Sequence, residues 1–278
     1  MSIIIHHNDL DGMASGAIVY RHISKTNWGN EKIQLHETDY EKPFPIDKIK
    51  ENEPVYIVDF CLEDDSMIDA LLKKTKNIVW IDHHKTSLKN KKMEHLDGIR
   101  DTRTAACELC WEYFFKSEPP YAVKLIADMD AWHWKYGFDT KNFTTGLMPY
   151  QMDPESKNWD RLFEEDKEFI DKIKNEGAIC VTFRDYLCKD YCESYGFETE
   201  FEGYKCFAVG FYNFGSLVFG DLMNKYDMCL SFEFNGEKWM IGLYSTKIDV
   251  SEIAEKHGGG GHSGASGMVC EKLPFKKS

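Results

Sequence analysis

The sequence lacks the features of a membrane or secreted protein. No apolar window is long enough to span a bilayer, and the N-terminus has no signal-peptide pattern. The nine cysteines are an odd number scattered through largely apolar surroundings, which argues against a disulfide framework. We therefore expect a cytoplasmic protein that does not bind a membrane.

Positive charge is also scarce. The formal net charge is −13, and the longest basic stretch is the small cluster from Lys89 to Lys92. Proteins that grip long nucleic acid usually present a basic groove, because affinity comes largely from neutralising phosphates. We therefore expect no long nucleic acid as a partner. Any phosphate-bearing substrate should be a short oligonucleotide or a small nucleotide.

Two kinds of catalytic centre lack their usual residue patterns. Cys107 and Cys110 form a lone CxxC with no matching second pair, so we interpret them as one face of a helix. No serine or cysteine nucleophile stands beside a paired base, which argues against metal-independent covalent hydrolysis.

Apolar and aromatic residues, by contrast, are plentiful: they make up 42% and 14% of the 278 residues, enough for packed cores. In the first half, apolar runs alternate with amphipathic segments, which predicts strands at 3–5, 33–38, 53–60 and 77–85. This βαβ rhythm predicts an α/β fold whose parallel sheet is covered by helices. We place this domain at 1–150 and a helical connector at 151–200.

The last part of the chain, 201–278, predicts a smaller α/β domain. Its pattern runs strand, helix, strand, strand, with the helix at 215–226. Asn235-Gly236 is a strong hairpin signal between the last two strands.

Polar clusters follow three of the predicted strands of the first domain. Asp9 and Asp11 follow the first strand, Asp59 ends another, and Asp82-His83-His84 ends the next. Carboxylates with imidazole form an oxygen-rich site that suits manganese or magnesium better than zinc. Two such ions sharing a carboxylate would activate a water and clamp a phosphoryl group.

In their order along the chain, these residues resemble the motifs of the DHH phosphoesterase superfamily. His7-Asn8-Asp9-Leu10-Asp11-Gly12 matches the first motif in its H-x-D-x-D-G form, Asp59 the second and Asp82-His83-His84 the third. LIADMDAWHW (125–134) resembles the fourth motif. GGGGHSGASG (258–267) resembles the G-G-G-H-x-x-A-x-G signature of the family's associated substrate-binding domain.

The resemblance implies two domains facing across a cleft, with two metal ions, usually Mn²⁺, on the first. It implies that Asp59 bridges the ions, that Asp82 supports the cluster, and that His84 contacts the scissile phosphate. The implied metal ligands are Asp9, Asp11, Asp59, His83 and Asp128, with His7 as a further member of the set. The substrate phosphate or terminal nucleotide would lie against Gly259, Gly260, Gly261 and His262.

Several positions depart from the family pattern or leave alternatives open. Ile5 stands where some members have a histidine ligand, so His7 either replaces that ligand or lies behind the metal shell. Asp128 and Asp130 compete for the fourth-motif role, and we favour Asp128. Tyr244 replaces the arginine of an S-L-R-S pattern, and its ring would stack on a base instead. Arg103 either meets a phosphate or is a solvated surface residue.

We therefore expect a Mn²⁺-dependent phosphohydrolase of short oligonucleotides or small nucleotides, with Mg²⁺ as an alternative ion. The alternatives within the family are a cyclic-dinucleotide phosphodiesterase and a nucleotide-bisphosphate phosphatase. A catalytically impaired nucleotide-binding module is the alternative from another class. Members of the family often pair, so a homodimer is possible, although no residue of this sequence indicates one.

Overall fold

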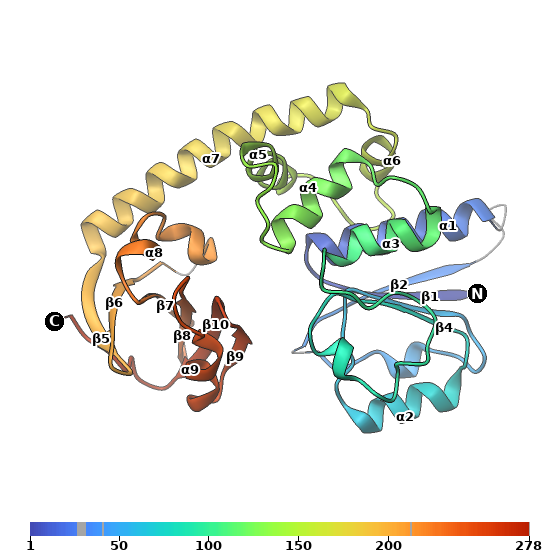
Figure 1. Ribbon diagram of the computed structural model, residues 1–278, viewed down its shortest axis with the longest axis horizontal. Coiled ribbons are helices and arrows are strands. Elements are labelled where there is room, and N and C mark those ends of the chain that lie inside the picture. Colours follow the sequence, from blue (N-terminus) through green and yellow to red (C-terminus); the bar gives the residue numbers. More distant parts are fainter. Residues whose placement is uncertain (27–31, 41, 212, 278) are drawn as a thin grey trace. The chain divides into compact units, whose positions relative to one another are not determined.

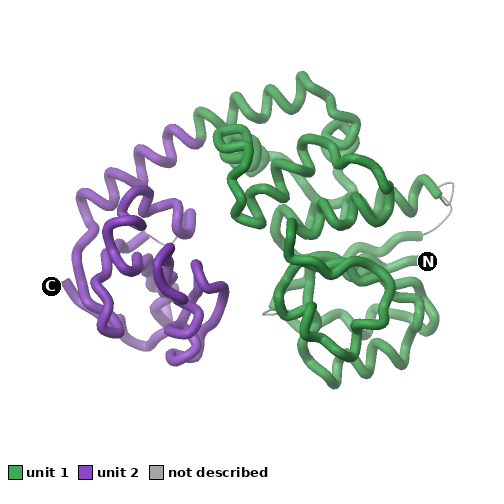
Figure 2. The backbone as a smooth tube through the Cα atoms, in the orientation of Figure 1, with its two compact units in different colours: residues 1–180 green, residues 181–278 purple. Residues whose placement is uncertain are grey.

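The computed structural model describes residues 1–26, 32–40, 42–211 and 213–277 (Figure 1). The chain forms two compact units, Met1–Cys180 and Val181–Ser278 (Figure 2). Helix α7 (Lys167–Tyr195) crosses from one unit to the other. The division at 150 and 200 stays a prediction. In the described part of the chain, no helix has the length and apolarity needed to cross a bilayer.

The first unit is built on a four-stranded sheet, as the sequence predicted. Its strands are β1 (Ser2–His7), β2 (Ile33–Thr38), β3 (Val55–Val58) and β4 (Ile78–Ile81). They are all parallel and lie in the order β2-β1-β3-β4. The run Ile3-Ile4-Ile5 is fully buried because β1 is central: Ile4 packs into the core on one face, and Ile3 and Ile5 into the core on the other.

Helices cover both faces of this sheet (Figure 1). The core on the Ile4 face includes residues of α1 (Leu10–Thr26), α3 (Ala106–Phe115) and α4 (Tyr121–Asp130). The other core includes residues of α2 (Asp65–Lys74) and lies near the short turns η1 (Ile46–Lys48) and η2 (Ser87–Lys89). Cys107 and Cys110 are both buried in α3.

Beyond α4, the unit continues into α5 (Phe138–Leu147), α6 (Asn158–Phe163) and the start of α7. Helices α5 and α7 cross closely at a glycine. A Cβ atom added to Gly177 would lie 1.8 Å from the backbone oxygen of Asn142, so only glycine allows this approach.

The second unit is a six-stranded sheet in the order β5-β6-β7-β8-β10-β9. Its pairs are antiparallel except β6 with β7. The strands are β5 (Phe197–Phe201), β6 (Tyr204–Val209), β7 (Met228–Phe234), β8 (Trp239–Tyr244), β9 (Gly260–His262) and β10 (Ala265–Cys270). Helix α9 (Val250–Lys256) contributes to the core of this unit. The mixed α/β class with a second sheet is therefore confirmed.

Two local predictions for this unit have different outcomes. The Asn235-Gly236 hairpin is confirmed: the Asn235 side chain accepts hydrogen bonds from the backbone N–H groups of Glu237 and Lys238, and Gly236 has a φ of 103°. The predicted helix at 215–226 is wrong as a single element. It is divided into η3 (Gly215–Val218) and α8 (Leu222–Lys225), because Gly220 adopts a left-handed φ of 47° between them.

Candidate metal centre

The carboxyl ends of three neighbouring strands bring the predicted polar residues together. His7 ends β1, Asp59 follows β3, and Asp82 follows β4. Because β2 and β3 lie on opposite sides of β1, the chain leaves this region in two directions, which creates a crevice at the sheet edge. Ligands of open parallel sheets bind at such an edge.

Asp59 is the buried centre of this region. It is 1% exposed, and neither of its carboxylate oxygens has a hydrogen-bond partner in the described part of the chain. Burial, followed by the charges of Asp11 and Asp9, raises the pKa of Asp59 well above its usual range. Its φ of 54° is also rare for a residue with a side chain. A buried carboxylate without partners is costly, and a bound cation would remove that cost.

Three groups of side chains around Asp59 have ligand atoms within 4.8 Å of one another. The groups are His7, Asp9 and Asp59; Asp59, His83 and His84; and Asp11, His83 and Asp130. The Nε2 atom of His83 lies 3.3 Å from Asp59 Oδ1 and 3.2 Å from Asp130 Oδ2. The Nδ1 atom of His7 lies 2.8 Å from Asp9 Oδ2 and 3.8 Å from Asp59 Oδ2. Asp59 therefore stands between two sets of potential ligands.

The two aspartates of the first motif are fixed by backbone groups. Both oxygens of Asp11 accept hydrogen bonds of 2.8 Å, one from the N–H of Ala106 and one from that of Cys107, at the start of α3. Asp9 accepts a hydrogen bond from the N–H of Gly12. Burial acts to raise the pKa of Asp9, but the hydrogen bond and charge of His7 outweigh it and lower the pKa to about 2. These contacts fix both carboxylates at the end of β1.

Gly12 itself cannot carry a side chain in this turn. An added Cβ atom would lie 2.4 Å from the backbone oxygen of His7. The glycine of the first motif therefore allows α1 to begin directly beside the end of β1.

The fourth motif contributes Asp130 to these groups, not the favoured Asp128. Asp128 accepts hydrogen bonds from the N–H groups of Lys135 and Tyr136 and from the hydroxyl of Thr140. Its carboxylate thus orders the loop that follows α4 and belongs to none of the three groups. Asp130, the last residue of α4, lies next to His83, and burial followed by the charge of Asp11 raises its pKa well above the usual range.

Asp82 and His84 form a hydrogen-bonded pair beside the centre. Asp82 is fully buried, and its Oδ1 atom lies 2.7 Å from His84 Nδ1 and 2.9 Å from the backbone nitrogen of His83. Burial acts to lower the pKa of His84, but the hydrogen bond and charge of Asp82 outweigh it, so the pKa is raised. A histidine held in this way favours the protonated form that an anionic phosphate would contact.

Tyr40 is a neighbour of the centre that the sequence motifs did not indicate. Its ring centroid lies 5.9 Å from that of His7 and 6.1 Å from that of His84. Burial raises the pKa of its hydroxyl, and the ring stacks on Phe60. The available signal was its position just after β2, whose carboxyl end lies beside that of β1.

The predicted substrate-binding residues are divided between the two units. The exposed Arg103 donates hydrogen bonds to Asp101 and Glu112, so its guanidinium is already engaged in ion pairs. Tyr244 lies in the second unit. Its hydroxyl is close to Gly242, because a Cβ atom added to Gly242 would lie 2.4 Å from the Tyr244 hydroxyl oxygen. Burial raises its pKa.

The glycine-rich run also lies in the second unit and forms the edge strand β9. Gly259 allows close packing, since an added Cβ atom would lie 2.1 Å from the backbone oxygen of Gly267. Gly261 has a φ of 142°, Gly260 pairs with Gly267, and His262 is exposed. The roles of these residues in substrate binding stay predictions.

A parallel α/β sheet with carboxylates and imidazoles gathered at its switch point defines an α/β domain with a cluster of side chains that could hold metal ions. Residues 2–130 match the DHH family, N-terminal domain, and this part of the chain belongs to that family. This match agrees with the resemblance to the DHH phosphoesterase superfamily that the motifs indicated.

Three comparisons extend this likeness over the rest of the chain. The uncharacterized protein R106 of Acanthamoeba polyphaga mimivirus is 25% identical over 100% of this chain and 70% of its own length. The oligoribonuclease NrnB of Bacillus subtilis is 24% identical over 94% of this chain and 71% of its own length. The DHH domain of a member of the s1p family of ribosomal proteins is similar in structure, with a TM-score of 0.63 and 14% identity over 96% of this chain and 82% of the other.

Proposed function

We propose that this protein hydrolyses phosphoester bonds of short oligonucleotides or small nucleotides with two divalent metal ions, Mn²⁺ in preference to Mg²⁺. The observation that carries the proposal is Asp59, a buried carboxylate that has no hydrogen-bond partner among the described residues and stands between two sets of ligand groups. Carboxylate oxygens with imidazole nitrogens suit these ions.

Two sets of residues would hold the ions, with Asp59 between them. One set is His7, Asp9 and Asp59; the other is Asp11, His83 and Asp130, with Asp59 Oδ1 3.3 Å from His83 Nε2. Bound ions would supply Lewis-acid stabilisation of the phosphoryl oxygens and an activated water. The hydrogen bonds from α3 to Asp11 hold one set in place, and the hydrogen bond from Gly12 to Asp9 holds the other.

His84 and Asp82 would act on the substrate side. Asp82 fixes the orientation of the His84 ring through Nδ1 and raises its pKa, which favours the cationic form. The imidazolium would then donate a hydrogen bond to an oxygen of the scissile phosphate and stabilise the charge that develops there.

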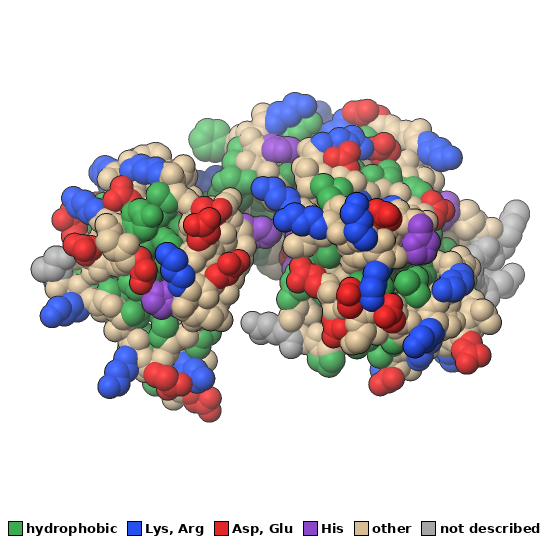
Figure 3. All heavy atoms as spheres, turned by 60° about the horizontal axis from the view of Figure 1, so that its bottom comes forward, with side chains coloured by type: hydrophobic (Ala, Val, Ile, Leu, Met, Phe, Trp, Pro, Cys, Tyr) green, Lys and Arg blue, Asp and Glu red, His purple; other side chains and the backbone are tan. Residues whose placement is uncertain are grey.

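The substrate class follows from charge and from kinship. The net charge is −13, and on the face seen in Figure 3 the Lys and Arg side chains are interspersed with Asp and Glu. Such a surface suits a short phosphate-bearing substrate better than a long strand. The relative NrnB is named an oligoribonuclease, which supports a short oligonucleotide.

A substrate panel with the purified protein tests this proposal. The panel contains dinucleotides, a short RNA and a short DNA, a cyclic dinucleotide, 3′-phosphoadenosine 5′-phosphate, pyrophosphate and a long single strand, each in Mn²⁺ with and without chelator. We expect chelator-sensitive cleavage of the dinucleotides or the short RNA, and its loss in Asp59→Asn. Nucleotide binding without turnover of any substrate would contradict the proposal and indicate a binding module.

A further inference from the structure

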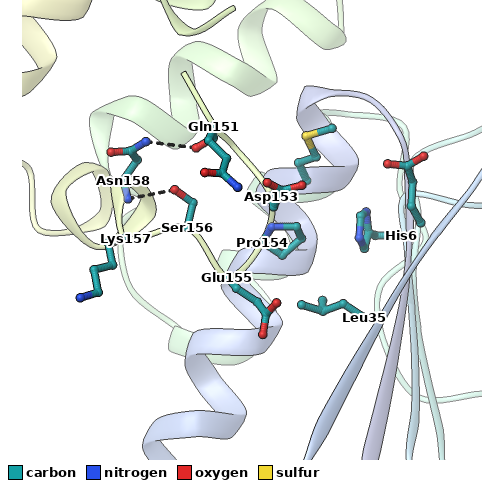
Figure 4. Close-up of a pocket in the computed structure, with 11 residues that line it drawn as sticks. His6, Leu35, Gln151, Asp153, Pro154, Glu155, Ser156, Lys157 and Asn158 are labelled. Atoms are coloured by element: carbon teal, nitrogen blue, oxygen red, sulfur yellow. Dashed lines mark hydrogen bonds between the residues drawn. The ribbon is translucent and has the colours of Figure 1, made fainter. Parts of the chain in front are cut away.

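A cavity of about 680 Å³ opens in the first unit, outside the metal groups. Its lining comes from β1, β2 and the start of α1, and from the segment 151–158 between α5 and α6. Figure 4 shows His6 and Leu35 from the strands on one side of the cavity, and Gln151 to Asn158 on the other. None of its lining residues belongs to a metal group.

The cavity nevertheless adjoins the metal centre through the backbone of β1. His6, which is 3% exposed, precedes His7, and the Nδ1 atom of its ring lies 2.8 Å from the backbone oxygen of His7. On the neighbouring strand, Glu37 is paired in register with His6. The cavity and the candidate metal groups therefore use adjacent residues of β1, whose side chains point to opposite faces of the sheet.

The wall formed by 151–158 is held in a fixed shape. The indole N–H of Trp159 donates hydrogen bonds of 3.1 Å to the backbone oxygens of Met152 and Asp153. The side-chain amide of Asn158 donates to the backbone oxygen of Gln151. A wall that is fixed before binding loses little entropy when a ligand is bound.

Pro154 packs the middle of this wall against α1. A Cβ atom added to Gly16 of α1 would lie 3.0 Å from Pro154 Cγ and 3.2 Å from His6 Cδ2. Glycine at this helical position therefore lets Pro154 and His6 both approach α1. With Met13 and Leu35, Pro154 gives the cavity apolar surface suited to a flat ring.

The polar lining offers mainly hydrogen-bond acceptors. The carboxylates of Asp153 and Glu155 have no hydrogen bond or ion pair with any described residue, whereas Glu37 is paired with Lys42. Among the described lining residues, Lys157 is the one lysine or arginine. Such a cavity disfavours a phosphate and favours a ligand that presents N–H donors.

We propose that this cavity binds a guanine base of the nucleotide substrate. Guanine presents an imino N–H and an amino N–H side by side, which match the two oxygens of one carboxylate, and its carbonyl oxygen accepts from Lys157 or Gln151. Adenine has an acceptor nitrogen where guanine has the imino donor, so it fits a carboxylate less well. The inference rests on the proposed function for the nucleotide nature of the ligand.

Binding of nucleosides in the presence of chelator tests this inference without hydrolysis. We would compare guanosine, inosine and adenosine by nuclear magnetic resonance titration, because nucleosides carry no phosphate to be repelled by the metal-free carboxylates. Guanosine should bind at least about tenfold more tightly than adenosine, and inosine, which lacks the amino group, should fall between them. Equal affinities, or no binding of guanosine, would overturn the inference.

Variants then locate the preference in the cavity. The double variant Asp153→Asn/Glu155→Gln should bring guanosine and adenosine to similar affinities. Glu51→Gln removes one exposed carboxylate outside the cavity and should keep the preference. A preference that survives the double variant would refute this role.

The substrate panel described for the proposed function, together with the nucleoside titrations, separates this inference from the proposed function. Hydrolysis of dinucleotides with no dependence on base would leave the proposed function standing and remove the guanine site. Selective binding of guanosine without hydrolysis of any substrate would support the guanine site and contradict the proposed function.

Discussion

At the scale of single residues, two aspartates of one helix have different tasks. Asp128 accepts two hydrogen bonds from the loop after α4 and one from Thr140 of α5, and Asp130 lies 3.2 Å from His83. The two positions are about 200° apart around the helix axis, so they point to opposite sides. The sequence alone could not decide between them, because nearly every residue of α4 before Asp130 is apolar or buried and the helix shows no clear outer face.

Exchanging each carboxylate for an amide distinguishes these tasks. Asp130→Asn should abolish Mn²⁺-dependent turnover while the thermal midpoint in chelator stays unchanged or rises, because a repelled carboxylate is removed. Asp128→Asn should lower the free energy of unfolding by about 1–3 kcal/mol, since its buried donors lose a charged acceptor. Thermal unfolding and a turnover assay on both variants give the comparison. Loss of stability in Asp130→Asn, together with loss of turnover but unchanged stability in Asp128→Asn, would contradict this assignment.

At the scale of helices and strands, what the sequence could and could not predict follows from the range of the interactions. The strand-end motifs were predictable because parallel strands place their carboxyl ends at one edge. The division of 215–226 was not, because it depends on the left-handed conformation of Gly220. The pairing of Arg103 with Glu112 depends on how the start of α3 lies against the preceding loop, which periodicity does not encode.

The crossing of α5 and α7 gives a prediction at this scale. Gly177→Ala replaces a poor helix former by the best one, which alone would stabilise α7 by about 1 kcal/mol. Because the new Cβ would lie 1.8 Å from the backbone oxygen of Asn142, we expect net destabilisation of about 1–3 kcal/mol instead. Chemical denaturation measures the sign. The control Asn175→Ala, at an exposed position of the same helix, should be neutral or slightly stabilising. A Gly177→Ala variant that is more stable than the native protein would show that the two helices do not cross closely.

At the scale of the whole molecule, the side chains of the candidate metal centre lower the stability of the metal-free protein. Asp59 is buried with a left-handed φ among the charges of Asp9, Asp11 and Asp130, and its carboxylate accepts no hydrogen bond from any residue that the structure describes. Such a cluster destabilises the metal-free fold and stabilises the metal-bound one, because ions bind only the folded arrangement of ligands. The protein should therefore depend on its ions for stability as well as for turnover.

Metal titration of thermal unfolding tests this dependence. Free Mn²⁺ at a hundred times its dissociation constant should stabilise the native protein by about 2.7 kcal/mol for each ion site and raise the midpoint accordingly. Asp59→Asn should lose this increase, and in chelator it should match or exceed the native midpoint, because asparagine removes the buried charge and tolerates a left-handed φ better. Glu51→Gln should keep the full Mn²⁺ response. A native protein whose midpoint is indifferent to Mn²⁺, or an Asp59→Asn variant that still responds in full, would show that the cluster at the strand ends is not where the ions bind.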